Sequence, residues 1–130
     1  MANLDRLTTS GAWNFLGMSV VRNDQGQIGV TLKNTPQMRQ MHGTMHGGLI
    51  ATVLDAAGGV AISETLSEGY GVTTVEIKVN YLLPVKTDLT AYAEIARKGS
   101  KLATAIVKGY DEDHNLVAIA TGTYRIVRLS

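Results

Sequence analysis

Hydrophobic and polar residues alternate along the second half of the chain with a period of two, which is typical of strands with one buried face. Residues 74–81 and 89–95 are such runs, and residues 102–110 and 116–128 give two further strand segments. Only short turns separate most of them, so we expect neighbouring runs to pair antiparallel.

The first half of the chain begins with a different pattern. Residues 4–15 have a loose apolar stripe that predicts a short helix. Residues 18–33 carry two apolar runs on either side of Asn23-Asp24-Gln25-Gly26, which predicts a hairpin. Residues 34–45 form a polar stretch that predicts a loop.

Residues 47 to about 66 give the one long helix, and its first turns have no clearly polar face. A helix that is apolar all round is a buried helix. The sheet must therefore curl to cover it, which predicts an α+β protein of the hotdog fold. We expect a curled antiparallel sheet of five or six strands wrapped around one long central helix.

Length and composition restrict the function classes further. The 130 residues predict a single domain spanning positions 1–130. Twelve basic residues nearly balance eleven acidic ones, which gives no reason to expect nucleic acid or a membrane surface as partner. There is no cysteine, and the N-terminal stretch is not a secretory signal. We therefore expect a soluble, cytoplasmic protein.

A glycine pair, Gly47-Gly48, opens the predicted helix. The first N–H groups of a helix have no partner within it and lie at the positive end of its dipole. Without side chains at these positions, a substrate carbonyl could approach the donors, as in an oxyanion site. The alternative is that the pair only allows a tight turn into the helix.

Asp55 places a lone carboxylate in the middle of this apolar helix. An unpaired buried charge is costly, so the residue needs a partner or a function. A purely structural carboxylate could be satisfied by backbone donors or by the hydroxyl of Thr52 or Thr73. His42 and His46 have a spacing compatible with a metal on a helix, but they precede the helix and no acid or cysteine nearby completes a set, so we expect no metal.

The spacing of these groups predicts a dimer. Gly47 and Asp55 are eight residues apart, or roughly 12 Å along a helix. Water activated by Asp55 could not easily reach a carbonyl held at Gly47 of the same chain. Two antiparallel helices from two subunits would place each Gly47 opposite the partner's Asp55, as in a two-fold homodimer. Dimers of this kind could pair further into a homotetramer.

At these residues the chain resembles the hotdog thioesterases of the phenylacetate-pathway type, which include the 4-hydroxybenzoyl-CoA thioesterases. The resemblance runs through His46-Gly47-Gly48 to Asp55, then residues 71–75, then residues 80–84. It covers nearly the whole chain in length and order of elements, and implies an acyl-CoA thioesterase that needs no cofactor, since CoA is part of the substrate.

The resemblance also implies residue roles. Gly47 N–H would polarise the thioester carbonyl, with Gln40 near it and His46 supporting the loop. Asp55 would act as general base or as nucleophile, and Thr73 would orient the water. Further substrate contacts would come from Gly48, Asn80 and the basic turn that contains Arg97, Lys98, Ser100 and Lys101.

Two other functions fit the same pattern. A dehydratase or hydratase would use His46 as its base and turn over an enoyl substrate. A non-catalytic acyl-CoA-binding module would bind its ligand without releasing thiol. The acyl group stays open between aromatic and medium-chain, because Gly59 stands where some aromatic-specific members carry threonine.

Overall fold

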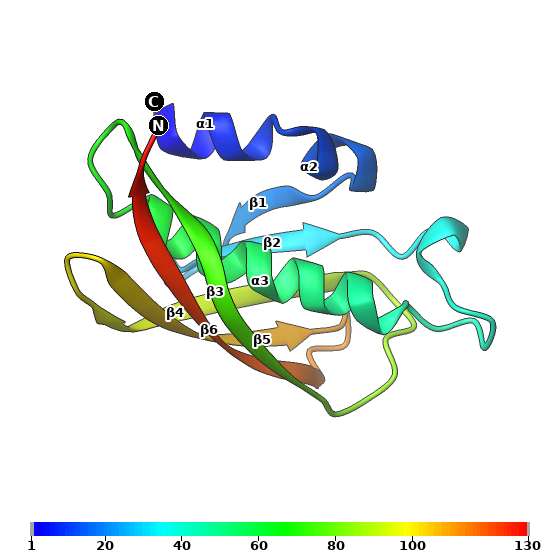
Figure 1. Ribbon diagram of the computed structural model, residues 1–130. Helices are drawn as coiled ribbons and strands as arrows, with labels where there is room; N and C mark the ends of the chain where they lie inside the picture. The colour runs from blue at the N-terminus through cyan, green and yellow to red at the C-terminus, as the bar shows by residue number, and fades with distance from the viewer. Residues whose placement is uncertain (1, 130) are drawn as a thin grey trace.

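Six strands form one antiparallel sheet in the computed structural model, which describes residues 2–129. The strands are β1 (Ser19–Arg22), β2 (Ile28–Leu32), β3 (Tyr70–Tyr81), β4 (Leu89–Lys98), β5 (Leu102–Tyr110) and β6 (Leu116–Arg128). Their order across the sheet is β1-β2-β4-β5-β6-β3 (Figure 1). The predicted hairpin and the four predicted runs are confirmed, although β3 begins before residue 74 and β4 ends after residue 95.

The long helix α3 (Gly47–Ser63) lies within the curve of this sheet (Figure 1). It begins at the predicted residue but ends before Leu66. The amides of Thr65 and Leu66 bond the carbonyls of Ile62 and Ser63, three residues back, so the helix tightens into a turn there. The sheet wrapped around one helix confirms the predicted hotdog fold.

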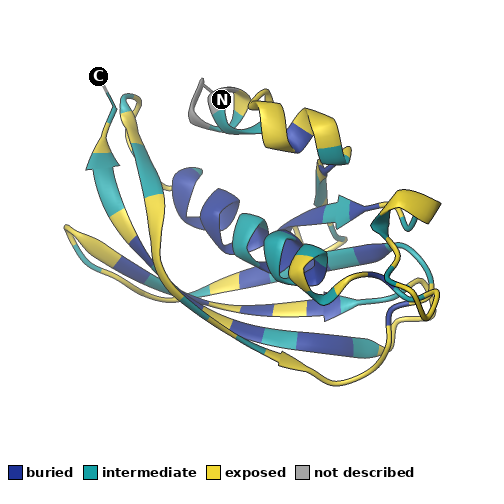
Figure 2. Ribbon diagram, turned by 45° about the vertical axis from the view of Figure 1, so that its right-hand side comes forward, coloured by how far each residue is buried: buried dark blue, intermediate teal, exposed yellow. Residues whose placement is uncertain are grey.

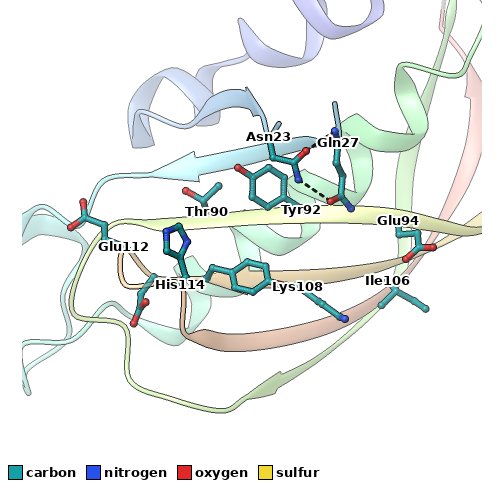
Figure 3. A pocket seen from close by; sticks show the side chains of 11 residues that line it. Asn23, Gln27, Thr90, Tyr92, Glu94, Ile106, Lys108, Glu112 and His114 are labelled. Atoms are coloured by element: carbon teal, nitrogen blue, oxygen red, sulfur yellow. Dashed lines mark hydrogen bonds between the residues drawn. The ribbon is translucent and has the colours of Figure 1, made fainter. Parts of the chain in front are cut away.

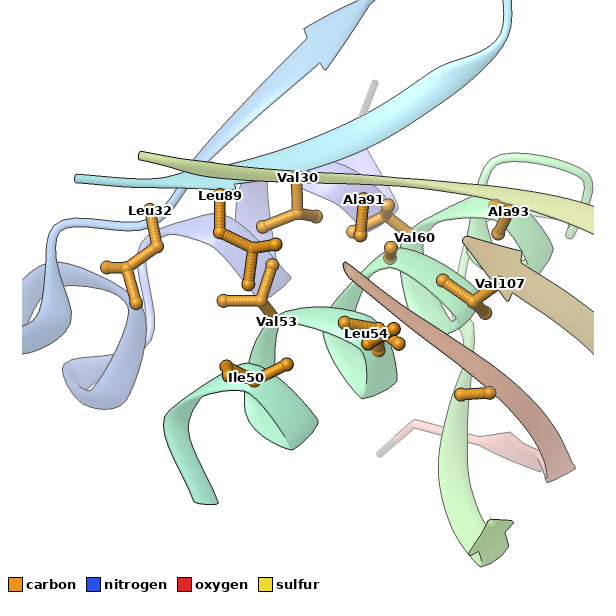
Figure 4. Packing of buried hydrophobic residues seen from close by; sticks show 14 of the residues in the cluster. Val30, Leu32, Ile50, Val53, Leu54, Val60, Leu89, Ala91, Ala93 and Val107 are labelled. Atoms are coloured by element: carbon orange, nitrogen blue, oxygen red, sulfur yellow. The ribbon is translucent and has the colours of Figure 1, made fainter. Parts of the chain in front are cut away.

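The core lies between α3 and the concave face of the sheet. Figure 4 shows Val53 and Leu54 of α3 beside Leu89 and other side chains of the sheet. The opposite side of α3 is less covered: Asp55 and Ala56 are only half-buried. The helix therefore keeps a partly open strip along which Asp55 lies.

Two short helices, α1 (Ala2–Thr8) and α2 (Gly11–Leu16), replace the single short helix predicted for residues 4–15. The break falls after Thr8: the Ser10 N–H bonds the Leu7 carbonyl, three residues back, and the extended backbone of Ser10, with φ −66° and ψ 158°, starts a new helix at Gly11. Trp13 is buried and fixes α2 to the core, and Gly17 ends α2 in the left-handed conformation, with φ 78°.

Strand β3 forms a long edge of the sheet, since it pairs only with β6. Much of it is exposed, as the yellow segments in Figure 2 indicate. An edge of this length presents backbone N–H and C=O groups without ladder partners. The register with β6 shifts between Thr74 and Glu76, which marks a bulge at Val75.

No helix within residues 2–129 has the length and apolar character needed to cross a bilayer.

Candidate functional site

The N-terminus of α3 is capped by His46, whose Nδ1 accepts a hydrogen bond of 3.1 Å from the Gly48 N–H. The amides of Leu49 and Ile50 bond the His46 carbonyl. Across the described residues, no hydrogen bond involves the Gly47 N–H. Gly47 therefore offers the open donor, whereas the Gly48 N–H that was predicted to contact substrate is occupied in this chain.

The same cap restricts what His46 can do. Its Nδ1 lone pair accepts from Gly48, so the proton of the neutral ring lies on Nε2. A dehydratase or hydratase would need a free lone pair on this ring to remove a proton. The arrangement fits a supporting role for His46 in the loop and at the helix terminus.

A shallow pocket of about 340 Å³ lies beside Gly47. Ile50 of α3 and the end of β3 form its walls, together with Leu82, Leu83 and Pro84 of the following connection. The Tyr81 hydroxyl donates to the Gly47 carbonyl at 2.8 Å and ties the helix N-terminus to β3. Gly47 thus faces a concavity lined mainly by apolar side chains.

Asp55 accepts a hydrogen bond of 2.8 Å at Oδ1 from the Thr74 hydroxyl of β3. The sequence pointed to Thr52 or Thr73 as the hydroxyl partner, and the structure corrects this. Thr52 donates instead to the Gly48 carbonyl at 2.9 Å. Thr73 pairs with Arg125 on β6 and lies on the opposite face of β3 from Thr74. Thr73 was predicted to orient the water, but it does not contact Asp55 in this chain.

Beneath Asp55 lies Tyr124 of β6, a residue that the sequence analysis missed. Its hydroxyl donates to the Asp55 backbone carbonyl at 2.8 Å, and the residue is only 1% exposed. Burial raises the pKa of the Tyr124 phenol above its usual range, and the Asp55 charge raises it further. The phenol therefore stays a protonated donor at neutral pH.

Two glycines make room for Tyr124. A Cβ at Gly58 would overlap its hydroxyl, and a Cβ at Gly122 would lie 2.7 Å from its ring. A net hydrogen bond contributes about 0.5–1.5 kcal/mol, while glycine instead of alanine costs about 1 kcal/mol inside a helix and roughly 0.5–1 kcal/mol inside a strand. Both glycines clear the ring as well as the hydroxyl, since ring carbons lie within 3.0 Å of either Cβ position. Gly58 and Gly122 were the sequence signal that a large side chain approaches here.

Gln40 lies in the loop before α3 and bonds within it. Its Nε2 donates to the Thr44 hydroxyl at 2.7 Å, and its Oε1 accepts from the His42 N–H. The side chain thus holds the loop that leads to His46, and both of its polar atoms are engaged in this chain.

The basic turn between β4 and β5 lies beyond the C-terminal end of α3, where Lys98 Nζ donates to the Thr65 carbonyl at 3.2 Å. Arg97, Ser100 and Lys101 are exposed there. Asn80 is exposed on β3, and its Oδ1 accepts from Lys78 Nζ at 3.3 Å. One chain therefore brings Thr74 to Asp55, but it holds Gly47 and the basic turn at opposite ends of α3.

Another hollow, of about 560 Å³, lies on the outer face of the sheet, with Tyr92, Lys108 and His114 among its lining residues (Figure 3). None of the predicted site residues lines it. Among the described residues, His, Asp and Glu side chains form no group of three that could hold a metal.

Comparison with known proteins identifies the family. The model of the thioesterase superfamily matches residues 42–118, more than half of the chain. The medium/long-chain acyl-CoA thioesterase YigI of Escherichia coli is 31% identical over 127 residues, covering 85% of this chain and 82% of that protein.

Solved structures agree with this match. A thioesterase of Haemophilus influenzae has a TM-score of 0.88 at 26% identity. The match covers 98% of this chain and 90% of the Haemophilus chain. A Bacillus halodurans protein solved with CoA has a TM-score of 0.88 at 26% identity. The match covers 99% of this chain and 86% of the Bacillus chain. With the helix, sheet and site described above, the chain belongs to the thioesterase superfamily and is a hotdog-fold thioesterase.

Proposed function

We propose that this protein hydrolyses acyl-CoA thioesters to a free acid and CoA. The observation that carries the proposal is the pairing, on one helix, of an open N–H at Gly47 with a carboxylate at Asp55 that Thr74 holds in place. The Escherichia coli relative named as an acyl-CoA thioesterase and the Bacillus halodurans protein solved with CoA support CoA as the carrier.

In this reaction the Gly47 N–H would donate to the thioester oxygen and stabilise the negative charge that develops there. Asp55 would take a proton from water as the water oxygen attacks the carbonyl carbon; alternatively its carboxylate would attack that carbon and form an anhydride with the acyl group, which water hydrolyses to the free acid once the thiolate has left. The C–S bond then breaks, and the leaving thiolate of CoA takes up a proton. No cofactor is needed beyond the substrate.

We further propose that the working site belongs to a homodimer. Gly47 and Asp55 are separated by roughly 12 Å along α3, so they cannot both reach one thioester in a single chain. The long β3 edge and the half-buried strip beside Asp55 are surfaces that a second copy would cover. Antiparallel α3 helices would place each Gly47 beside the partner's Asp55, and two such dimers could associate into a homotetramer.

The same arrangement accounts for the basic turn. Within one chain this turn lies at the far end of α3 from Gly47, because Lys98 contacts the Thr65 carbonyl there. In a pair of antiparallel helices, the far end of one helix lies beside the Gly47 of the other. We therefore assign the phosphates of CoA to the partner's basic turn, with Arg97, Lys98, Ser100 and Lys101 as the contacts.

For the acyl group we propose an aromatic or medium-chain tail, held in a slot of about 590 Å³ between α2 and the first turn of α3. Phe15, Leu16, Met38 and Leu49 give the slot an apolar lining. It lies close to the donor, because the His46 N–H bonds the Met38 carbonyl at 2.8 Å.

A thiol-release assay tests the proposal. The parent and Asp55→Asn proteins would be given a panel of aromatic and aliphatic acyl-CoAs. Asparagine keeps the shape of the side chain and can still accept from Thr74, so the fold should survive. We expect the rate to fall by about 10²–10⁴, the usual contribution of a catalytic acid or base.

Equal rates for the two proteins would refute the role of Asp55. If the parent binds acyl-CoA but releases no thiol from any member of the panel, the protein is a binding module. Turnover of an enoyl-CoA that depends on His46 would identify a dehydratase or hydratase instead.

A further inference from the structure

Asp55 is held at two points by adjacent strands of the sheet. Thr74 of β3 donates to its carboxylate, and Tyr124 of β6 donates to its backbone carbonyl, both at 2.8 Å. Thr74 and Tyr124 are direct partners in the β3–β6 register, so their side chains rise from the same face of the sheet. Together they fix both the backbone and the side chain of one residue.

We propose that Tyr124 is a positioning residue for Asp55, and that its hydroxyl sets the place of the carboxylate in the catalytic site. This inference rests on the proposed hydrolysis of acyl-CoA. Tyr124 touches neither substrate nor water in the proposal; it acts through the backbone of Asp55.

The surroundings of Tyr124 leave space for both its ring and its hydroxyl. A Cβ at Gly58 would meet the hydroxyl oxygen before any other atom of the residue, and Gly122 clears space on the strand itself. Phenylalanine would fill nearly the same volume without a polar atom to satisfy. Only the hydroxyl distinguishes tyrosine from phenylalanine here, and the atom that receives its hydrogen bond belongs to Asp55.

The turn of α3 that Tyr124 holds is followed by two glycines. Gly58 and Gly59 follow Asp55 by about one turn, and glycine leaves the helix backbone freer than any other residue does. A carboxylate that must meet a thioester held by another element tolerates little displacement, because a misplacement of about 1 Å can cost about 10²-fold in rate.

The decisive experiment compares kcat and KM for four proteins: the parent, Tyr124→Phe, Asp55→Asn and the double variant. Tyr124→Phe should lower kcat about tenfold and leave KM within about twofold, since only the reacting geometry changes. In the Asp55→Asn background the same change should have no further effect on the residual rate. Tyr92→Phe on the outer face of the sheet is the matched control, with kcat expected to stay at the parental value.

The double variant separates positioning from a general loss of structure. If Tyr124→Phe lowers the residual rate of Asp55→Asn as much as it lowers the parental rate, the effect does not pass through Asp55 and the proposal is wrong. An unchanged kcat in Tyr124→Phe, with only a lower Tm, would overturn it as well. If Asp55→Asn itself is fully active, the proposed function fails rather than this inference alone.

A second variant covers the case in which Tyr124→Phe folds poorly. Gly58→Ala keeps the phenol but places a methyl group where the hydroxyl lies. Displacing the hydroxyl should lower kcat about tenfold at constant KM, as its removal does. A parental kcat in Gly58→Ala would contradict the proposal.

Discussion

At the scale of single residues, the hydroxyl that meets Asp55 belongs to Thr74, one position from the threonine that the family resemblance indicated. The two side chains are chemically identical and differ only in direction: Thr74 projects toward α3, and Thr73 projects away from it. Neighbouring threonines on opposite faces of one strand provide a test with a built-in control.

We expect Thr74→Val to lower kcat about tenfold, because valine keeps the volume but removes the donor that orients the carboxylate. Thr73→Val should stay within about twofold of the parent. Steady-state thiol release measures both. The reverse result would mean that Thr73 serves the site, as the resemblance implies, through a contact that only the assembled protein contains.

The bulge at Val75 explains why the sequence pattern misplaced these side chains. A strict period of two puts Val75, Ile77, Val79 and Tyr81 on one face and Thr74 on the other. In the structure Val75 is 59% exposed. The register shift lies at this residue, so the apolar residues that follow it lie on the same face as Thr74. A bulge adds one residue to a strand without changing its composition, so alternation alone could not reveal it.

At the scale of the helix, the first residue of α3 offers an unusually clean substitution. The Gly47→Pro variant would lack the N–H that the proposed mechanism uses. Proline is favoured at the first position of a helix, and His46 before it already has the extended conformation that proline requires, with φ −61° and ψ 133°. The nearest atoms to a Cβ at Gly47 would be those of the Tyr81 side chain, at an ordinary contact distance of 3.6 Å.

Gly47→Pro should therefore fold and lose about 10²–10³ in kcat, the usual effect of removing one oxyanion donor. Gly47→Ala keeps the N–H and should retain most of the activity. Circular dichroism would confirm that both variants keep the parental helix content. A Gly47→Pro protein as active as Gly47→Ala would show that the thioester oxygen is bound elsewhere.

Local pattern was sufficient for α3 itself and for its two chemical groups. An apolar run with one carboxylate, opened by two glycines, indicated a buried helix, and both Gly47 and Asp55 lie on it. Tyr124 could not be found in this way, because its contact with Asp55 spans 69 positions along the chain and depends on the pairing of β3 with β6. Contacts set by long-range register lie beyond what alternation and spacing reveal.

At the scale of the whole molecule, the shared-site proposal predicts that two inactive variants restore each other. In a mixed dimer of Asp55→Asn and Gly47→Pro chains, one site combines the intact Gly47 of the first with the intact Asp55 of the second. The other site carries both lesions. Random assembly gives mixed dimers about half of the time, so activity should return to about a quarter of the parental value.

Co-expression of the two variants with different affinity tags, followed by purification on both tags, would isolate the mixed dimer. A mixed dimer without activity would place each site within one subunit. A parent that elutes at the mass of a monomer would remove the basis for sharing altogether.

The fold as a whole was more predictable than its details. A sheet of five or six strands curled around one long helix follows from the count of apolar runs and from a helix with no polar face to expose, and the structure has six strands. The division of the N-terminal segment into α1 and α2 was missed, because the loose apolar stripe continues past Ser10, whose extended backbone separates the two helices.

The space around Tyr124 has a consequence for how this sequence can change over time. A side chain at Gly58 or Gly122 fits only if Tyr124 moves or is replaced by a smaller residue. Substitutions at positions 58, 122 and 124 are thus expected to depend on one another during evolution. A lineage that alters one of them must alter another or lose the anchor beneath its carboxylate.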